Sequence, residues 1–208
     1  MVKVEAAVAA DALTLGAMQL NAFDDDYFDD MFVEPYTAVA WASFISRAEE
    51  ASSGLKSRVS VIRDENGTAK AACLLYIAPD EDAVNELYGP WEESWGARRP
   101  DMNKDKLDAF FGGMKTQHKS TMCHVPHVYL EILMAHSTAR RRGYGLALLE
   151  FANGIADELQ MPLYLNSDEG VVGLYERVGY VRQPGEMRAS DMMVPMVRPA
   201  VKVSARTR

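Results

Sequence analysis

The chain has 208 residues, 48% of them hydrophobic, and a net charge of -8. A chain of this length can bury one good core, so we expect a single domain over residues 1–208. Its acidity argues against a nucleic-acid partner, which needs a basic surface, and suits a cationic substrate better. It has no apolar run near the roughly 18–20 residues of a membrane span and no signal-peptide layout, so we expect a cytoplasmic protein that binds no membrane.

The N-terminal region predicts a strand, a helix and an acidic stretch. Apolar and charged side chains alternate over residues 2–8, which predicts a first strand. Asp11 is the expected N-cap of a helix that runs to about residue 23. Five aspartates are then interleaved with aromatic and apolar side chains over residues 24–32. This stretch is either a solvated acidic loop or part of a surface that attracts an amine by charge and aromatic faces.

A second helix and a β-hairpin follow. Residues 38–51 predict a helix that buries Trp41, Phe44 and Ile45. Residues 58–64 and 69–78 predict two strands, because the Asn66-Gly67 pair between them is a strong hairpin-turn signal.

Residues 79–126 form the least regular part of the chain. We expect one helix in this insertion, from residue 104 to about residue 119, with an apolar inner face of Leu107, Phe110, Phe111 and Met114. The insertion is long for a connection in a compact domain. It is either a lid or wall of a binding site, or an appendage that only packs.

The most informative segment begins with an apolar strand at residues 128–134. A basic turn at residues 135–145 and an amphipathic helix at residues 146–159 follow it. The N-terminus of such a helix presents unpaired N–H groups and the positive end of the helix dipole, which together form a seat for phosphate. Small glycines let a phosphate approach the main chain, and arginines add charge and paired donors. The turn supplies both types and therefore indicates a diphosphate ligand: Arg140, Arg141, Arg142, Gly143 and Gly145.

The C-terminal part predicts a strand at residues 161–166 and a helix at residues 170–177. A final strand or hairpin partner is expected within residues 187–197. The tail at residues 199–208 has no apolar pattern and is expected to fray.

Two motifs in this order resemble those of the GNAT superfamily of N-acetyltransferases. Arg140-x-x-Gly143-x-Gly145 is similar to the loop that binds the pyrophosphate of coenzyme A. Leu174-Tyr175-x-x-x-Gly179-Tyr180 is similar to the Leu-Tyr-x-x-x-Gly-Phe signature that closes the family's core, with Tyr180 where phenylalanine is usual. The resemblance implies an α/β GNAT fold with a mixed, mostly antiparallel central sheet, splayed between its fourth and fifth strands and flanked by helices.

The same resemblance implies how acetyl-CoA, the co-substrate, is held. Residues 140–145, Tyr144 included, would bind its pyrophosphate. The backbone of Leu133, Met134 and Ala135 would pair with the pantetheine arm and receive the thioester carbonyl. Asn166 and Ser167 could add polar contacts to that arm. Asp168 stands where the family often has an asparagine, and a carboxylate is a poor substitute near phosphates.

Tyr175 is the implied general acid for the leaving thiolate, and its alternative role is that of a buried aromatic side chain. Strict alternation along the strand places five residues on one face, with Glu131 among them: His127, Tyr129, Glu131, Leu133 and Ala135. It places Val128, Leu130, Ile132 and Met134 on an apolar face against the core. Family members carry a base at positions matching Tyr129 and Glu131, and a carboxylate in a partly desolvated cleft has a raised pKa, so Glu131 is the predicted base. Its alternative role is an ion pair with an arginine.

The acceptor site is expected to use Tyr27, Phe28, Tyr129 and His127, with Tyr129 either a wall or a proton relay. We therefore predict transfer of an acetyl group from acetyl-CoA to a primary amine of a small molecule, by direct attack in a ternary complex. The alternatives are a peptide or protein N-acetyltransferase and a non-catalytic acyl-CoA-binding module. A closed pocket roofed by residues 80–124 would indicate a small molecule, and an open groove a peptide. Histidine and cysteine spacing predicts no metal site and two free thiols. A monomer or a homodimer is expected.

Overall fold

A seven-stranded sheet forms the centre of the computed structural model, which describes residues 2–23, 28, 31–32, 36–50, 54–95, 103–184 and 193–201. Its strand order is β1-β2-β3-β4-β5-β7-β6. All neighbouring strands are antiparallel except β4 and β5, which are parallel. The strand bounds are β1 Glu5–Ala6, β2 Lys56–Arg63, β3 Ala69–Ala78, β4 His127–Ala135, β5 Leu163–Asp168, β6 Val181–Arg182 and β7 Met193–Arg198.

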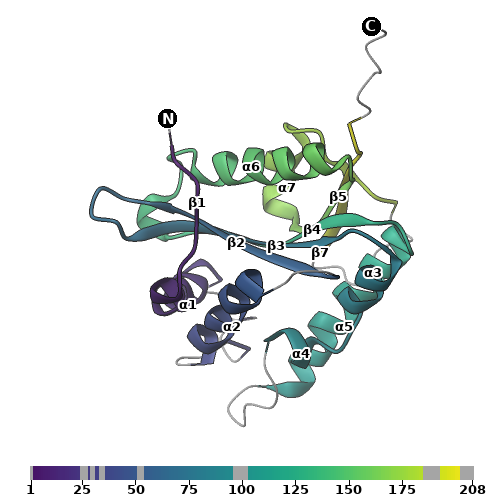
Figure 1. The fold of residues 1–208 in the computed structure, drawn as a ribbon, viewed down its shortest axis with the longest axis horizontal. Coiled ribbons are helices and arrows are strands. Elements are labelled where there is room, and N and C mark those ends of the chain that lie inside the picture. The colour runs from purple at the N-terminus through teal and green to yellow at the C-terminus, as the bar shows by residue number, and fades with distance from the viewer. Residues whose placement is uncertain are drawn as a thin grey trace, which may run out of the picture.

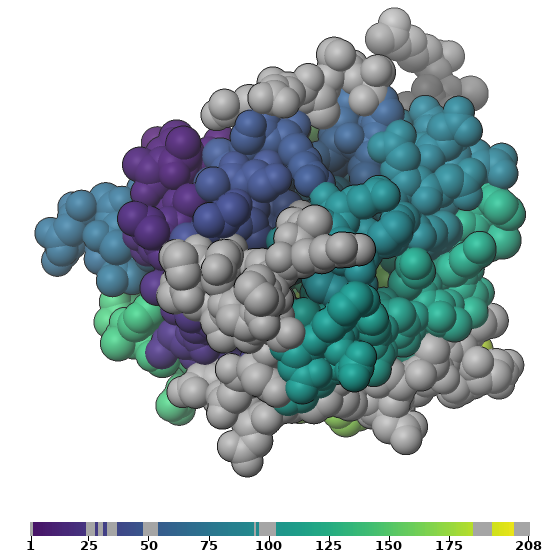
Figure 2. All heavy atoms as spheres, turned by 90° about the horizontal axis from the view of Figure 1, so that it is seen from below, coloured from purple at the N-terminus to yellow at the C-terminus, as the bar shows by residue number. Residues whose placement is uncertain are grey.

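Helices cover both faces of this sheet (Figure 1). One face carries α6 Tyr144–Leu159 and α7 Val172–Glu176. The other carries α1 Ala12–Ala22, α2 Tyr36–Glu50, α4 Trp91–Trp95 and α5 Lys104–Met122, and α3 Glu81–Leu87 follows the end of β3. Figure 2 views this second face, where α1 and α2 lie beside the teal helices of the insertion. Three short 3-10 turns complete the order: η1 Ala9–Asp11, η2 Ser137–Ala139 and η3 Glu169–Val171.

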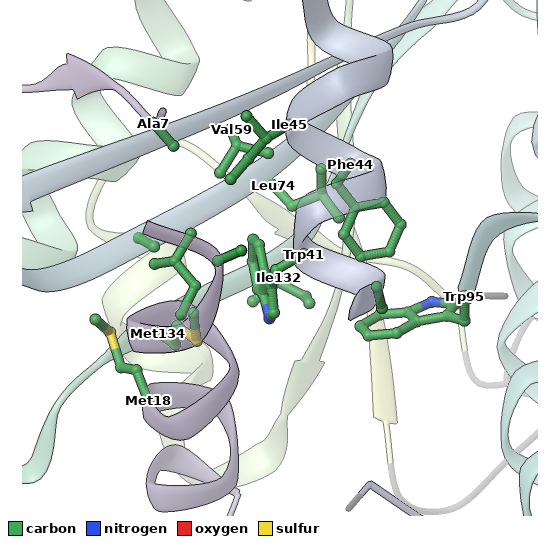
Figure 3. Packing of buried hydrophobic residues seen from close by; sticks show 14 of the residues in the cluster. Ala7, Met18, Trp41, Phe44, Ile45, Val59, Leu74, Trp95, Ile132 and Met134 are labelled. Carbon is green, nitrogen blue, oxygen red and sulfur yellow. The ribbon is translucent and has the colours of Figure 1, made fainter. Parts of the chain in front are cut away.

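Each face of the sheet has its own apolar cluster. Trp41, Phe44 and Ile45 of α2 are buried as predicted, and they pack with Trp95 of α4 and Ile132 of β4 (Figure 3). On the opposite face, α6 and α7 bury a second cluster against the sheet, which includes Leu148, Leu149 and Tyr175. Burying large apolar side chains stabilises a fold by about 1.5–3 kcal/mol each, so these two clusters hold the helices on the sheet.

The parallel pair β4–β5 is joined over a short distance. The paired residues are Val128 with Leu163, Tyr129 with Tyr164 and Leu130 with Leu165. Beyond Leu130, β4 continues along β3 to Ala135 without a paired residue on β5. The predicted splay between the fourth and fifth strands is thus confirmed, and it begins at Glu131 on one strand and Asn166 on the other.

A β-bulge in β4 lies at the start of this splay. Leu75 of β3 pairs with Leu130 and Leu74 pairs with Ile132, so Glu131 is an extra residue without a partner on β3. A bulge shifts the alternation of side chains along a strand. The prediction of strict alternation is therefore wrong beyond Leu130. Ile132 and Met134 pack in the same cluster as Tyr129, on the face of α1 and α2, whereas Leu133 and Ala135 pack with Val128 and Leu130 on the face of α6.

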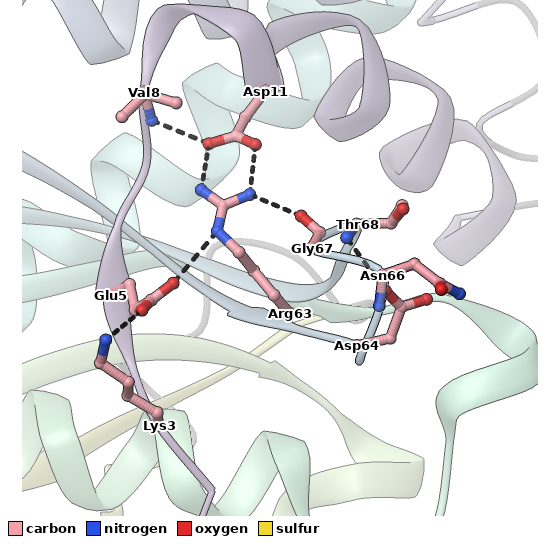
Figure 4. Close-up of polar contacts among 9 residues, drawn as sticks. All are labelled: Lys3, Glu5, Val8, Asp11, Arg63, Asp64, Asn66, Gly67 and Thr68. Atoms are coloured by element: carbon pink, nitrogen blue, oxygen red, sulfur yellow. Dashed lines mark hydrogen bonds and ion pairs between the residues drawn. The ribbon is translucent and has the colours of Figure 1, made fainter.

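The N-terminal segment differs from its prediction in two ways (Figure 4). Of the strand expected at residues 2–8, Glu5 and Ala6 form β1 and pair with β2, and the Ala7 N–H adds one hydrogen bond of 3.0 Å to the Val59 carbonyl. Asp11 does not cap α1, because its carboxylate is occupied elsewhere. It accepts two hydrogen bonds of 2.7 Å from the Arg63 guanidinium and one of 2.8 Å from the Val8 N–H. This bidentate pair ties the start of α1 to the β2–β3 hairpin.

The remaining elements follow the sequence with a few corrections. The hairpin turn is present, with Gly67 at a φ of 79°. In the insertion, α5 is longer than predicted, and α3 and α4 were not predicted. The final strand begins at Met193 and pairs with β6, which was also not predicted, while residues 187–192 and the aspartates at 24–30 lie outside the described residues. No helix in the described ranges is both long and apolar enough to cross a membrane.

Candidate active site

The insertion roofs a cavity of about 320 Å³ over the sheet. The sheet contributes Tyr76, Tyr129 and Glu131 to its wall. The helices α4 and α5 and the turn before them contribute most of the rest: Gly89, Pro90, Trp91, Glu92, Trp95, Asp108, Phe111, Gly112, Met114, Lys115 and His118. The insertion is therefore a wall of a cavity rather than an appendage that only packs.

A smaller cavity of about 60 Å³ adjoins the first on the side of α1. It is lined mainly by aromatic side chains, Phe28 among them, and by Asn166 at the start of the splay. The two cavities share five lining residues: Trp95, Phe111, Met114, Tyr129 and Glu131. Glu131, the extra residue of the bulge, thus lies where the two cavities meet. Phe28 lies as expected beside this space, and Tyr27 lies outside the described residues.

Glu131 has the properties of a base. Its Oε1 accepts a hydrogen bond of 2.9 Å from the Trp95 indole Nε1. Burial raises the pKa of its carboxyl from 4.5 to about 7, against the opposing effect of hydrogen bonds from Trp95 and Tyr76. Within the described ranges, no arginine pairs with this carboxylate. A base with a pKa near neutrality is suited to removing a proton at neutral pH.

The basic turn leads into the N-terminus of α6. Gly143 precedes the helix with a φ of 80°, a left-handed conformation that a side chain would strain, and Arg141 has a φ of 61°. No side chain caps the helix, and its first recorded internal bond runs from Ala147 N–H to the Gly143 carbonyl, 2.9 Å. The earlier N–H groups are therefore available to an anion, and an added Cβ at Gly143 or Gly145 would meet nothing within 4 Å. Tyr144 is half-buried in the first turn.

The three arginines of the turn are not equivalent. Arg141 and Arg142 are exposed in the turn that precedes the helix. Arg140 instead donates a hydrogen bond of 3.3 Å to the Ala22 carbonyl at the end of α1, which the spacing did not predict. Asn21 makes a second link, since its Oδ1 accepts from the Ser137 N–H at 2.9 Å. The turn is thereby braced against α1.

The backbone of β4 after the bulge borders the splay. Leu133, Met134 and Ala135 pair with Cys73, Ala72 and Ala71 of β3, and β5 supplies no partner on their other side. Main-chain polar groups that point toward the splay can pair with a ligand there. This is the position expected for a pantetheine arm.

Tyr175 of α7 is buried in the cluster beneath α6, with its ring 5.7 Å from that of Tyr180. Burial raises the pKa of its phenol to about 12, so it carries its proton at neutral pH. A protonated phenol is able to act as a general acid.

The three polar residues at the end of β5, Asn166, Ser167 and Asp168, make different contacts. Asn166 lines the smaller cavity, and its Oδ1 accepts from Gln117 Nε2 at 2.6 Å and from the Tyr164 hydroxyl at 2.8 Å. Ser167 is buried and donates to the Asp168 carbonyl at 2.8 Å. The Asp168 carboxylate accepts from the Gly170 N–H at 2.7 Å and so caps η3.

His127 is fully buried and lines neither of these two cavities, contrary to the expectation that it faces the acceptor. Its Nε2 lies 2.7 Å from His118 Nε2, and His118 does line the larger cavity. Sequence reasoning also missed Trp95 and Tyr76. Of the missed residues His118, Trp95 and Tyr76, the first two lie in the insertion, whose irregular pattern gave no signal for their placement. Among the described residues, no three His, Cys, Asp or Glu side chains gather as a metal site would require.

Comparisons with known proteins agree with this geometry. The family model described as "Acetyltransferase (GNAT) family" matches residues 26–180. A search of curated proteins returned no match. Among solved structures, "histone acetyltransferase HPA2 and related acetyltransferase" from Corynebacterium glutamicum is 20% identical, with a TM-score of 0.56, over 97% of this chain and 98% of that chain.

A second solved structure is the PaiA N-acetyltransferase from Thermoplasma acidophilum in complex with coenzyme A. It is 10% identical, with a TM-score of 0.56, over 96% of this chain and 99% of that chain. At these identities the likeness concerns the fold. The family match covers most of the chain. The chain therefore belongs to the GNAT acetyltransferase family and is an acyltransferase that takes its acetyl group from acetyl-CoA.

Proposed function

We propose that the protein acetylates a primary amine of a small molecule. The observation that carries this proposal is the larger cavity, which the insertion encloses against the sheet with Glu131 on its wall. An acceptor that must reach Glu131 has to fit beneath α4 and α5. A cavity covered by helices in this way favours a small molecule over an extended peptide, which needs an open groove.

The charges and rings around the larger cavity suit a cation. Among the described residues, three carboxylates line it, those of Glu92, Asp108 and Glu131, against one ammonium, that of Lys115. Lys104 pairs with Asp108 at 2.6 Å and lies 3.5 Å from Glu92, so these two are partly neutralised. The Glu131 carboxylate is held by the Trp95 indole instead and can accept a proton from the amine. Indole and phenol rings around it can stabilise an ammonium group through their faces.

The reaction needs a neutral amine, a polarised carbonyl and a protonated leaving group. Acetyl-CoA supplies the thioester when bound. Glu131 accepts a proton from the substrate ammonium, directly or through water, and its raised pKa matches this task. Backbone N–H groups of residues 133–135 stabilise the carbonyl oxygen as the C–N bond forms. Tyr175 donates its proton to sulfur as the C–S bond breaks, and the proton that the newly acylated nitrogen loses restores the phenol through water.

Direct attack is favoured because neither cysteine is placed as a nucleophile. Cys73 is fully buried in β3, and burial raises the pKa of its thiol to about 12, so it is not ionised at neutral pH. Cys123 is exposed at the end of α5 and lines neither of the two cavities. A ternary complex of enzyme, acetyl-CoA and amine is the simplest arrangement.

The test is release of free CoA thiol from acetyl-CoA with a panel of small primary amines and basic peptides. We expect turnover with small amines that have free primary nitrogens and none with their tertiary counterparts. Turnover with peptides alone would replace the proposal with a peptide N-acetyltransferase. No turnover with either class, while acetyl-CoA still raises the melting temperature, would indicate an acyl-CoA-binding module.

A further inference from the structure

Two buried histidines stand beside the larger cavity. His118 of α5 is 3% exposed and His127 of β4 is 0% exposed. Their Nε2 atoms are 2.7 Å apart, and His127 Nδ1 lies 2.6 Å from the Val125 carbonyl oxygen. These contacts form a chain from the Val125 backbone through His127 to His118, which lines the cavity.

This series of hydrogen bonds determines which ring nitrogens of the two histidines carry a hydrogen atom. A carbonyl oxygen can only accept, so His127 Nδ1 carries the hydrogen and donates to Val125. Neutral His127 then has an accepting Nε2, so His118 Nε2 must be the donor in the contact between the rings. Burial lowers the pKa of both histidines, and for His118 the neighbouring His127 lowers it further, so both are neutral at neutral pH. The remaining nitrogen, His118 Nδ1, is therefore an acceptor.

The ring of His118 is held in place by three tyrosines. It stacks on Tyr164 with centroids 4.1 Å apart and an interplanar angle of 3°. The Tyr129 ring is 4.5 Å away, and Tyr88 meets the ring edge-on at 5.2 Å. Within the described ranges, no protein donor is recorded at Nδ1. His118 thus lines the cavity, and its Nδ1 is an acceptor for which the described residues supply no recorded donor.

We propose that His118 Nδ1 is a subsite for a hydroxyl or second amino group of the acceptor, so that the enzyme prefers amines that carry a second hydrogen-bond donor. This inference rests on the proposed function, since it names the class of amine that the larger cavity takes. Glu131, His118 and Tyr129 line the same cavity, and the Tyr129 ring lies 4.5 Å from that of His118. A simple alkylamine that filled this space would bury the nitrogen without a partner.

The expected preference follows from that unpaired nitrogen. A lost neutral hydrogen bond reduces affinity by about two- to thirteenfold, and an acceptor left buried without a partner by about five- to over a hundredfold. We therefore expect the hydroxylated amine to bind about tenfold more tightly than its plain counterpart.

The test compares amino alcohols with alkylamines of the same length, from 2-aminoethanol and ethylamine to 5-aminopentan-1-ol and pentylamine. Affinities for the full chain with CoA bound are measured by calorimetry, which requires no turnover, and kcat/KM by release of CoA thiol. At least one amino alcohol in the series should bind about tenfold more tightly than its partner. Equal affinities within every pair, or no binding by any amine, would overturn the subsite.

Two substitutions separate the nitrogens of His118. His118→Gln places an amide near the position of Nε2 and should abolish the preference. His118→Asn places an amide oxygen near the position of Nδ1 and should restore part of it. His124→Gln is the matched control, because His124 is an exposed histidine that pairs with Glu81 and lines neither of the two cavities. A preference that survives in the Gln variant would also overturn the subsite.

The two proposals fail in different ways. If no amine is acetylated but the amino alcohols bind more tightly in a manner that depends on His118, the proposed function fails and the subsite stands. If amines are acetylated with no preference within the pairs, the function stands and the subsite is overturned. The comparison of wild-type affinities decides the matter even where a His118 variant does not fold.

Discussion

Replacing Glu131 with glutamine should slow the enzyme and stabilise its fold. The neutral amide keeps the size of the side chain but cannot take a proton. General-base catalysis contributes typically about 10²- to 10⁴-fold, so we expect kcat to fall by at least about a hundredfold. The KM for acetyl-CoA should change little, because Glu131 lies on β4 and not in the phosphate turn. In the wild type, kcat/KM should rise with pH around the carboxyl pKa of about 7.

The gain in stability follows from the same shift. The pKa of Glu131 is higher in the folded protein, about 7, than its ordinary value of 4.5. The folded state therefore holds an extra proton between these values, and the free energy of unfolding falls as the pH rises through this window. The full shift corresponds to about 3 kcal/mol. Because the side chain is only half-buried, solvent screening reduces this to about 1–2 kcal/mol.

Thermal unfolding at two pH values measures this effect. At pH 8 the glutamine variant should melt about 2–8 °C above the wild type, since 1 kcal/mol moves the melting temperature of a chain of this size by about 2–4 °C. Near pH 4.5 the difference should largely disappear, because the wild-type carboxyl is then protonated in the folded state. A variant that retains more than about a tenth of the wild-type kcat, or that gains no stability at pH 8, would refute the role given to Glu131.

Three further substitutions test other parts of the structure. Tyr175→Phe should lower kcat about a hundredfold with little change in the KM for acetyl-CoA, and a loss of less than about tenfold in CoA release would exclude a general acid. Trp95→Phe removes a hydrogen bond that lowers the pKa of Glu131, so the rising limb of the pH–rate profile should move to higher pH, and an unmoved limb would contradict this. Asp11→Asn should cost about 2–4 kcal/mol in urea unfolding, because it deprives the partly buried Arg63 guanidinium of its bidentate carboxylate and leaves Glu5, at 3.2 Å, as its carboxylate partner. The Arg63 hydrogen bond lowers the pKa of Asp11, so the stabilisation is present above the ordinary carboxyl range and is lost as the pH falls, and a penalty that did not shrink in acid would oppose it.

The sequence predicted most of the regular elements, because their patterns are local. The turn at Asn66-Gly67 requires a glycine conformation that defines a hairpin, and the helix at residues 144–159 has a clear apolar face. The strand, turn and helix around Gly143 are contiguous in the chain, so a donor site there could be predicted from the residues of the turn and their resemblance to the loop of the GNAT family. The acceptor side is assembled from segments far apart in the chain, and spacing does not carry that information.

The errors have physical causes that a local pattern does not contain. The bulge at Glu131 depends on the register between β3 and β4, and one extra residue reversed the direction of every later side chain in β4. Asp11 was expected to cap a helix, yet a charged partner 52 residues away in the chain, Arg63, donates two stronger hydrogen bonds to it. The helices α3 and α4 are short, with 7 and 5 residues, and so show too few turns for a period to be recognised. His118 lies on a helix face that looks like core, and only the folded chain brings it to His127.

The contacts of Arg140 and Asn21 connect the phosphate turn to the last turn of α1, whose chain continues toward Phe23 and Phe28 beside the smaller cavity. If binding of the donor tightens this turn, it displaces the end of α1, which borders the smaller cavity. Thermodynamic linkage makes such coupling reciprocal, so the acceptor must alter the affinity for the donor by the same factor. The affinity for each of the two substrates would then depend on whether the other is bound. Substitutions that adapt this enzyme to a new amine would then also change its affinity for the donor. We expect compensating substitutions at the end of α1.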